Sequence, residues 1–136
     1  MRDASARVLE AHETVLEVPA LSSVWMDKVE LPELDVFTEY VSFQAYDGDN
    51  ILSEGTVIFS YPKYFRYQNP ELSYTLDGDW ITVHANAYAK SIEIQNENED
   101  LVLSDNYFDL NGGSKRVHIE RGIPDGIRLQ SVYDIR

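Results

Sequence analysis

The sequence has 136 residues, which is enough for one domain, or for one small domain with part of a neighbour. Hydrophobic residues make up 43% of it, so the chain can bury a core and does not belong to the disordered class. The formal net charge is −13. Both halves of the chain are acidic, which excludes the basic surface expected of nucleic-acid-binding proteins and of proteins that bind anionic membranes.

The sequence contains no cysteine, and residues 1–5 do not lead into the apolar core of a signal peptide. No apolar run approaches the length of a membrane span. Small secreted domains often depend on disulfides, so their absence favours a cytoplasmic location.

Apolar and polar residues alternate with a period of two along much of the chain, which is typical of strands with one buried face. In the N-terminal half this pattern predicts four strands, at residues 6–18, 22–31, 39–46 and 51–60. The sequence Asp47-Gly48-Asp49-Asn50 suits a tight hairpin turn. Four strands leave sheet faces and edges uncovered, so this half is expected to pack on the rest of the chain or on a second chain.

A junction between two units is expected at residues 61–70, where prolines bracket an aromatic-rich segment. Proline cannot continue a central strand, and a hydrophobic contact between the units is expected around Tyr64, Phe65 and Tyr67. The predicted units are residues 1–65 and residues 66–136.

The C-terminal half carries seven short predicted strands, at residues 71–76, 80–88, 91–95, 101–104, 106–110, 115–120 and 127–134. Turn-forming sequences separate them, namely Asp77-Gly78-Asp79, Asn96 to Asp100, Asn111-Gly112-Gly113 and Pro124-Asp125-Gly126. Strands of this length, with turns every ~8–12 residues, predict an all-β fold, an antiparallel immunoglobulin-like β-sandwich.

The segment Ser104-Asp-Asn-Tyr-Phe-Asp-Leu110, with the Asn-Gly-Gly turn after it, resembles the closing domain of the β-mannosidases of glycoside hydrolase family 2. The terminal residues 129–136 are similar to the last strand of that family. The resemblance implies a parent enzyme that hydrolyses terminal β-mannosides and holds its two catalytic carboxylates on a (β/α)₈ barrel. It also implies that residues 1–65 are the closing strands of a preceding sandwich.

The chain itself is expected to be non-catalytic, because such a barrel needs about 250 residues and repeated βα units. We predict no catalytic residue, no cofactor and no metal. The three histidines lack the spacing of zinc ligands. Oxygen-bearing side chains between Asp47 and Glu54 lack the spacing of a calcium loop, so a hairpin turn is the simpler interpretation.

The segment around Asp105 and Asn106 is interpreted as a kink between two strands. The two side chains are expected to bond nearby backbone groups, and Tyr107, Phe108 and Leu110 are expected to enter the core.

Exposed aromatic rings suggest a second function, because flat rings can stack on sugar rings. The candidate contact residues, for a sugar or for a neighbouring domain, are Trp25, Trp80, Tyr64 and Tyr67. Three interpretations therefore remain: an accessory domain that supports the barrel of a β-mannosidase-like enzyme, a carbohydrate-binding module, or an unrelated immunoglobulin-like interaction domain. The expected partners are the other domains of the parent glycosidase. An oligosaccharide and a second copy paired through exposed strand edges are the alternatives.

Overall fold

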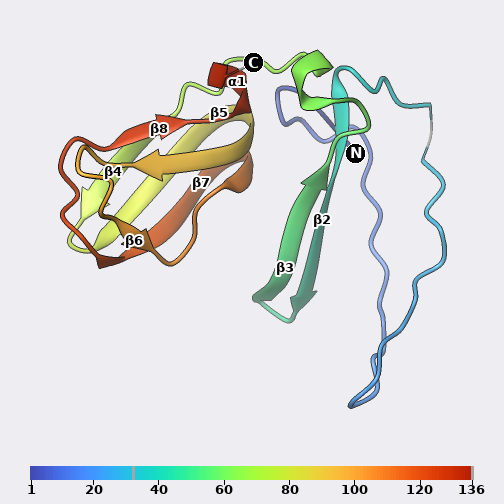
Figure 1. Ribbon diagram of the computed structural model, residues 1–136. Coiled ribbons are helices and arrows are strands. Elements are labelled where there is room, and N and C mark those ends of the chain that lie inside the picture. Colours follow the sequence, from blue (N-terminus) through green and yellow to red (C-terminus); the bar gives the residue numbers. More distant parts are fainter. Residues whose placement is uncertain (32, 136) are drawn as a thin grey trace.

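The computed structural model describes residues 1–31 and 33–135, which form two all-β units side by side (Figure 1). The strands are β1 (Arg2–Asp3), β2 (Glu39–Asp47), β3 (Asn50–Val57), β4 (Ser73–Asp77), β5 (Trp80–Gln95), β6 (Val102–Leu103), β7 (Phe108–Arg121) and β8 (Arg128–Gln130). A 3₁₀ turn covers Pro62–Tyr64, and a short helix, α1, covers Val132–Ile135. No helix in these described residues is long and apolar enough to cross a membrane.

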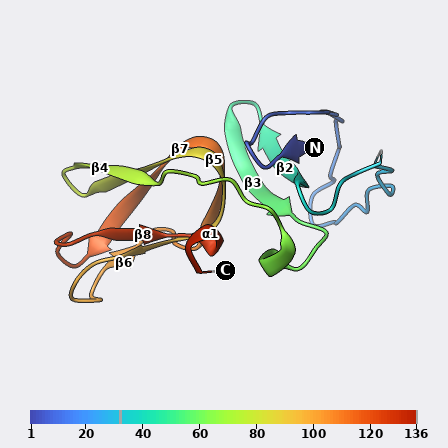
Figure 2. The ribbon, with the colours of Figure 1, turned by 90° about the horizontal axis from the view of Figure 1, so that it is seen from above.

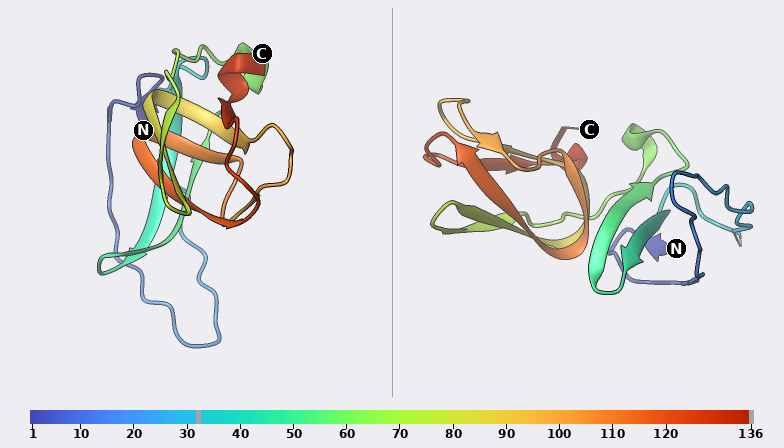
Figure 3. Two further views of the ribbon diagram at one scale, coloured as in Figure 1. Left: turned by 90° about the vertical axis from the view of Figure 1, so that its left-hand side faces the viewer. Right: turned by 90° about the horizontal axis from the view of Figure 1, so that it is seen from below.

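The C-terminal unit is built around two long strands, β5 and β7, which pass from one layer into the other. The first half of β5 pairs with β4, and its second half pairs with β8. Strand β7 pairs antiparallel with β5 in both halves, and its end pairs with β6. The two layers enclose a common interior (Figure 3). The predicted antiparallel immunoglobulin-like β-sandwich is therefore confirmed.

Each of these long strands was predicted as two separate strands, and this prediction is wrong. The pairing register of β5 with β7 shifts between Ala85 and Tyr88 and again between Ala89 and Ile92. Such bulges bend a strand without ending it. The Asn-Gly-Gly sequence predicted as a turn lies inside β7, where Gly112 and Gly113 have φ angles of 71° and 77°. Glycine reaches this region at little cost, so the strand bends there and continues.

Alternation places the apolar side chains of the C-terminal unit in one core. In β5, Ile81 and Val83 are fully buried, whereas Thr82 and His84, which alternate with them, are partly exposed. The complete core consists of Ile81, Val83, Ala85, Ala89, Ile92, Ile94, Phe108, Leu110, Val117, Ile119 and Ile127. This periodicity is the signal from which the fold class could be predicted.

The last predicted strand, at residues 127–134, is only partly formed. Strand β8 ends at Gln130, and α1 follows. The Asp134 carboxylate accepts hydrogen bonds from the backbone N–H of Ser131 (2.7 Å) and from its hydroxyl (3.1 Å). This arrangement caps the first turn of the helix and explains why the chain leaves the sheet.

The N-terminal unit is a three-stranded sheet in the order β1–β2–β3. The hairpin turn at Gly48 and Asp49 has the predicted two-residue form, with φ = 58° at Gly48. The strands predicted at 6–18 and 22–31 are absent: residues 10–31 contain no strand and form a long loop (Figures 1 and 3). The Tyr46 hydroxyl of β2 donates a hydrogen bond to the Glu13 carboxylate of this loop. Alternation alone does not make a strand, because the backbone also needs a paired neighbour.

Candidate functional site

An aromatic cluster joins the two units, which lie against each other in Figure 2. Tyr40 of β2 stacks on Tyr88 of β5 with ring centroids 3.8 Å apart and planes 15° apart. Phe65 and Tyr67, from the segment that connects the units, pack on the same stack, and their ring centroids are 4.7 Å apart. All four rings are 5% exposed or less. Burial of four aromatic rings makes this junction the main apolar contact between the units.

A polar network borders the aromatic junction. The Thr56 hydroxyl of β3 lies 2.6 Å from the Tyr88 hydroxyl and donates a short hydrogen bond to the Asp109 carboxylate. Asp109 also accepts hydrogen bonds from the backbone N–H of Ser91 (2.7 Å) and from the Lys90 ammonium group (3.2 Å). Thr56 and Asp109 are 53 positions apart, so this network connects the two units.

A second polar contact between the two units lies two residues further along β7. The Tyr40 hydroxyl donates a hydrogen bond of 2.9 Å to Oδ1 of Asn111. Asp109 and Asn111 are next-but-one neighbours on β7, so both point to the same face of the sheet. The segment that carries the family resemblance therefore also supplies the polar side chains that hold the N-terminal hairpin.

A cavity of about 340 Å³ opens beside this network, between the hairpin and the sandwich. Lys115 lies at its wall, where its ammonium group is 2.7 Å from the Asp105 carboxylate and 3.8 Å from that of Glu54. The same ammonium group is 4.7 Å from the centre of the Phe108 ring. Opposite charges and a cation–π contact therefore hold this lysine in place.

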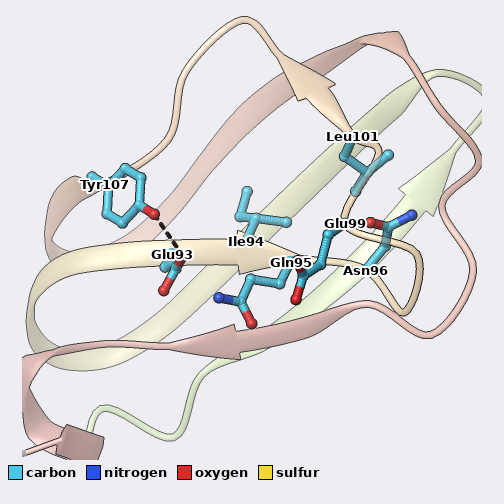
Figure 4. Close-up of a pocket in the computed structure, with 7 residues that line it drawn as sticks. All are labelled: Glu93, Ile94, Gln95, Asn96, Glu99, Leu101 and Tyr107. Atoms are coloured by element: carbon cyan, nitrogen blue, oxygen red, sulfur yellow. Dashed lines mark hydrogen bonds between the residues drawn. The ribbon is translucent and has the colours of Figure 1, made fainter.

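A second cavity, of about 310 Å³, lies at the end of β5 (Figure 4). The Tyr107 hydroxyl donates a hydrogen bond of 2.6 Å to the Glu93 carboxylate at one end of this cavity. Gln130 donates a second one, of 2.5 Å, to the other carboxylate oxygen. The hydrogen bonds from Tyr107, and then those from Gln95 and Gln130, lower the pKa of Glu93, so its side chain is negatively charged at neutral pH. The lining residues are Glu93, Ile94, Gln95, Asn96, Glu99, Leu101 and Tyr107.

The kink at residues 105–107 differs in part from the expectation. Asn106 bonds the backbone as predicted: it accepts from the N–H of Ile94 (2.8 Å) and donates to its carbonyl (3.1 Å). Asp105 instead pairs with Lys115. The prediction that Tyr107 enters the core is wrong, because this side chain is 62% exposed. Asn106 and Phe108 both point inward, which leaves the ring of Tyr107 outside.

The four predicted contact residues lie in four different environments. Trp25 is 96% exposed, in the loop of residues 10–31 that contains no strand. Trp80, which is 39% exposed, packs against His118 of β7, with ring centroids 4.8 Å apart. Tyr64 is 55% exposed, whereas the ring of Tyr67 is buried in the aromatic junction. These positions place the four side chains in different surroundings, and their contact with a sugar or a neighbouring domain stays a prediction.

Glu93, Tyr107 and Asp109 are among the residues at these two sites that were not candidates. Asp109 and Tyr107 are adjacent to inward-facing apolar residues, and the pattern of this segment predicts a kink and core packing but no polar partner for either side chain. Their partners, Thr56 and Glu93, lie 53 and 14 positions away, so no local pattern could have paired them. Within residues 1–31 and 33–135, no group of three or more His, Asp or Glu side chains is arranged to hold a metal ion.

The fold and the kinked segment define an immunoglobulin-like β-sandwich whose long strands bend between two layers. Residues 67–135 match the family model of the Ig-fold domain of mannosidases (Ig_mannosidase), and the match covers this sandwich from the aromatic junction to α1. The chain therefore belongs to the mannosidase Ig-fold domain family, as the segment at 104–110 predicted. No curated protein matches the sequence.

Proposed function

We propose that this chain is a non-catalytic accessory unit of a β-mannosidase-like glycoside hydrolase, in which it supports the catalytic barrel. The single observation that carries the proposal is the family match over residues 67–135. An accidental resemblance would not extend over the whole sandwich, so an unrelated interaction domain is no longer a competing interpretation. The β-mannosidase specificity of the parent enzyme, its catalytic barrel and the cytoplasmic location remain part of the proposal.

We further propose that residues 1–65 belong to the sandwich that precedes this domain. The family match begins after them, and their apolar side chains are unusually exposed. Val15, Leu21 and Trp25 are each at least 95% exposed. Phe43 of β2 and Val57 of β3 are 50% and 42% exposed. So many exposed apolar side chains favour contact with another protein surface over contact with water. The strand pattern suggests that this surface is the rest of a preceding sandwich.

The proposal can be tested by complementation. A family 2 β-mannosidase that lacks its terminal Ig-fold domain is mixed with the purified chain, and hydrolysis of p-nitrophenyl β-mannoside and the thermal midpoint of the enzyme are measured. We expect no hydrolysis by the chain alone, and a higher midpoint or recovered activity in the mixture. An unrelated immunoglobulin-like domain is the control. Hydrolysis by the chain alone would refute the non-catalytic assignment, and a mixture that behaves like the control would refute barrel support.

A further inference from the structure

We propose that the cavity beside Tyr107 and Glu93 is a subsite for one neutral hexopyranose unit of an oligosaccharide. The inference goes beyond barrel support. Only the choice of mannose as the first sugar rests on the proposed function. The site differs from the four aromatic residues predicted from the sequence, because it combines an exposed ring with fixed hydrogen-bonding groups in a cavity (Figure 4).

The first observation is the position of the Tyr107 ring. It is 62% exposed and borders both the cavity at the end of β5 and the cavity beside the hairpin. Its backbone has φ = 60°, a left-handed conformation that costs a residue with a Cβ about 1–2 kcal/mol. Strained residues of this kind concentrate at binding sites, where the surrounding structure holds them.

The second observation is that the neighbours of Tyr107 fix the direction of its ring. Asn106 is bonded to both backbone groups of Ile94, and Phe108 is buried in the core with 7% exposure. The hydroxyl of Tyr107 is held by Glu93 at 2.6 Å. The ring is therefore fixed at both ends before any ligand arrives, which reduces the entropy that binding would cost.

The third observation is the chemistry of the cavity wall. Glu93 offers carboxylate oxygens, and Gln95 carries an amide group that can donate and accept. The Asn96 amide is buried and already bonded to Asp100 and to the Ile123 carbonyl, so it shapes the wall and leaves the sugar contacts to Glu93 and Gln95. Sugar hydroxyls also donate and accept, and the C–H face of a pyranose suits the exposed ring. The volume of about 310 Å³ is at the lower end of the range for small-molecule sites.

The composition of the wall also argues against other ligand classes. The lining contains two carboxylates and no Lys or Arg, so phosphates and other anions would be repelled. An apolar ligand would cover the partly exposed Glu93 and Gln95 side chains and offer them no hydrogen bonds in place of water. A cation could contact the ring and Glu93, and it is therefore included in the test as a competing ligand.

The test is a titration of the ¹⁵N-labelled full chain with β-1,4-mannotriose, followed by amide chemical shifts. We expect saturable shifts confined to residues 93–107 and 130, with a Kd on the order of 1 mM, as suits a single shallow subsite. Maltotriose reports on selectivity among hexoses. Tetramethylammonium chloride tests the cationic alternative, and an equal response to it would overturn the proposal.

Three variants at one position separate binding from folding. Tyr107→Phe keeps the ring and is expected to change the Kd by less than about threefold, the size of one weak hydrogen bond. Tyr107→Ala should weaken binding by about tenfold or more. Tyr107→Asn suits the left-handed backbone, so it should keep the folded spectrum and still lose the response. Unchanged binding in Tyr107→Asn, or no shifts with the wild-type chain, would overturn the subsite.

The result is independent of the complementation experiment. Absence of sugar binding with successful complementation would remove the subsite and leave the accessory role. Shifts of Tyr107 that occur only when the truncated mannosidase is added would also overturn the subsite, because they would identify this surface as a contact with the enzyme.

Discussion

At the scale of single residues, the Asp109 carboxylate accepts three hydrogen bonds from groups in two units of the protein. Its side chain is 16% exposed, and that of Lys90 is 21% exposed. Removing the carboxylate would leave the Ser91 N–H and the Lys90 ammonium group without these acceptors in a partly buried setting. The cost of an unsatisfied donor in such a place exceeds the value of an ordinary surface contact.

We expect Asp109→Ala to lower the free energy of unfolding by about 1–3 kcal/mol, measured by urea denaturation. Asp105→Ala is the matched control, because its ion pair with Lys115 is more open to solvent, with the carboxylate 44% exposed. The control should cost about 0–1 kcal/mol. Equal losses in both variants would show that Asp109 does not hold the units together.

The buried tyrosines predict a loss of stability in alkaline solution. Burial raises the pKa of both Tyr40 and Tyr88 above the ordinary tyrosine value. In the unfolded chain both ionise near pH 10, whereas in the folded chain they stay protonated, so the unfolded state is favoured as the pH rises above about 10. We expect the urea midpoint to fall between about pH 9.5 and pH 11.5. Tyr40→Phe should make this fall shallower, and an unchanged slope would contradict the assignment.

At the scale of elements, β5 and β7 are continuous strands that change layers. The sequence pattern breaks at residues 86–91 and at Gly112-Gly113, and breaks of this kind are typical of turns. Bulges and positive φ angles allow a strand to bend without ending. The same residues are therefore compatible with a turn between two strands and with one bent strand. The choice between them depends on the pairing of β5 with β7, which joins residues up to 38 positions apart at Trp80 and His118.

The bend in β7 can be tested at Gly113. Its φ angle is 77°, and a Cβ added there would meet no atom within 4 Å, so the cost of Gly113→Ala is conformational alone. We expect this substitution to lower the free energy of unfolding by about 1–2 kcal/mol in thermal or urea melts. Gly113→Asn should cost less, because asparagine tolerates the left-handed region. If alanine and asparagine cost the same, the backbone does not keep this conformation.

At the scale of the whole molecule, the two units differ in how they are stabilised. The sandwich has its own core, whereas the N-terminal hairpin depends on the aromatic junction and on the contacts of Asp109 and Asn111. Residues 11–31 are exposed throughout and make no strand pair. Exposed chain without regular pairing is where proteases cut first.

We expect limited chymotrypsin digestion to cleave first within residues 11–31, at sites such as Leu21 and Trp25, and to leave residues 67–135 intact. Mass spectrometry of the early fragments checks the order. First cuts inside β5 or β7 would contradict the stability assigned to the sandwich. Protection of residues 11–31 that increases with protein concentration would support the alternative in which a second copy covers this segment.

The fold class, the two-residue hairpin turns and the family could all be predicted from the sequence alone. These features are local: alternation marks the buried face of a strand, Asp-Gly suits a tight turn, and the 104–110 segment is contiguous. The folded structure was needed to show which strands are continuous, that residues 10–31 form no strand, and that Asp109 meets Thr56 and Tyr107 meets Glu93. These outcomes depend on partners distant in the sequence, because a strand, a buried carboxylate or a fixed ring is stabilised by the groups that fold against it.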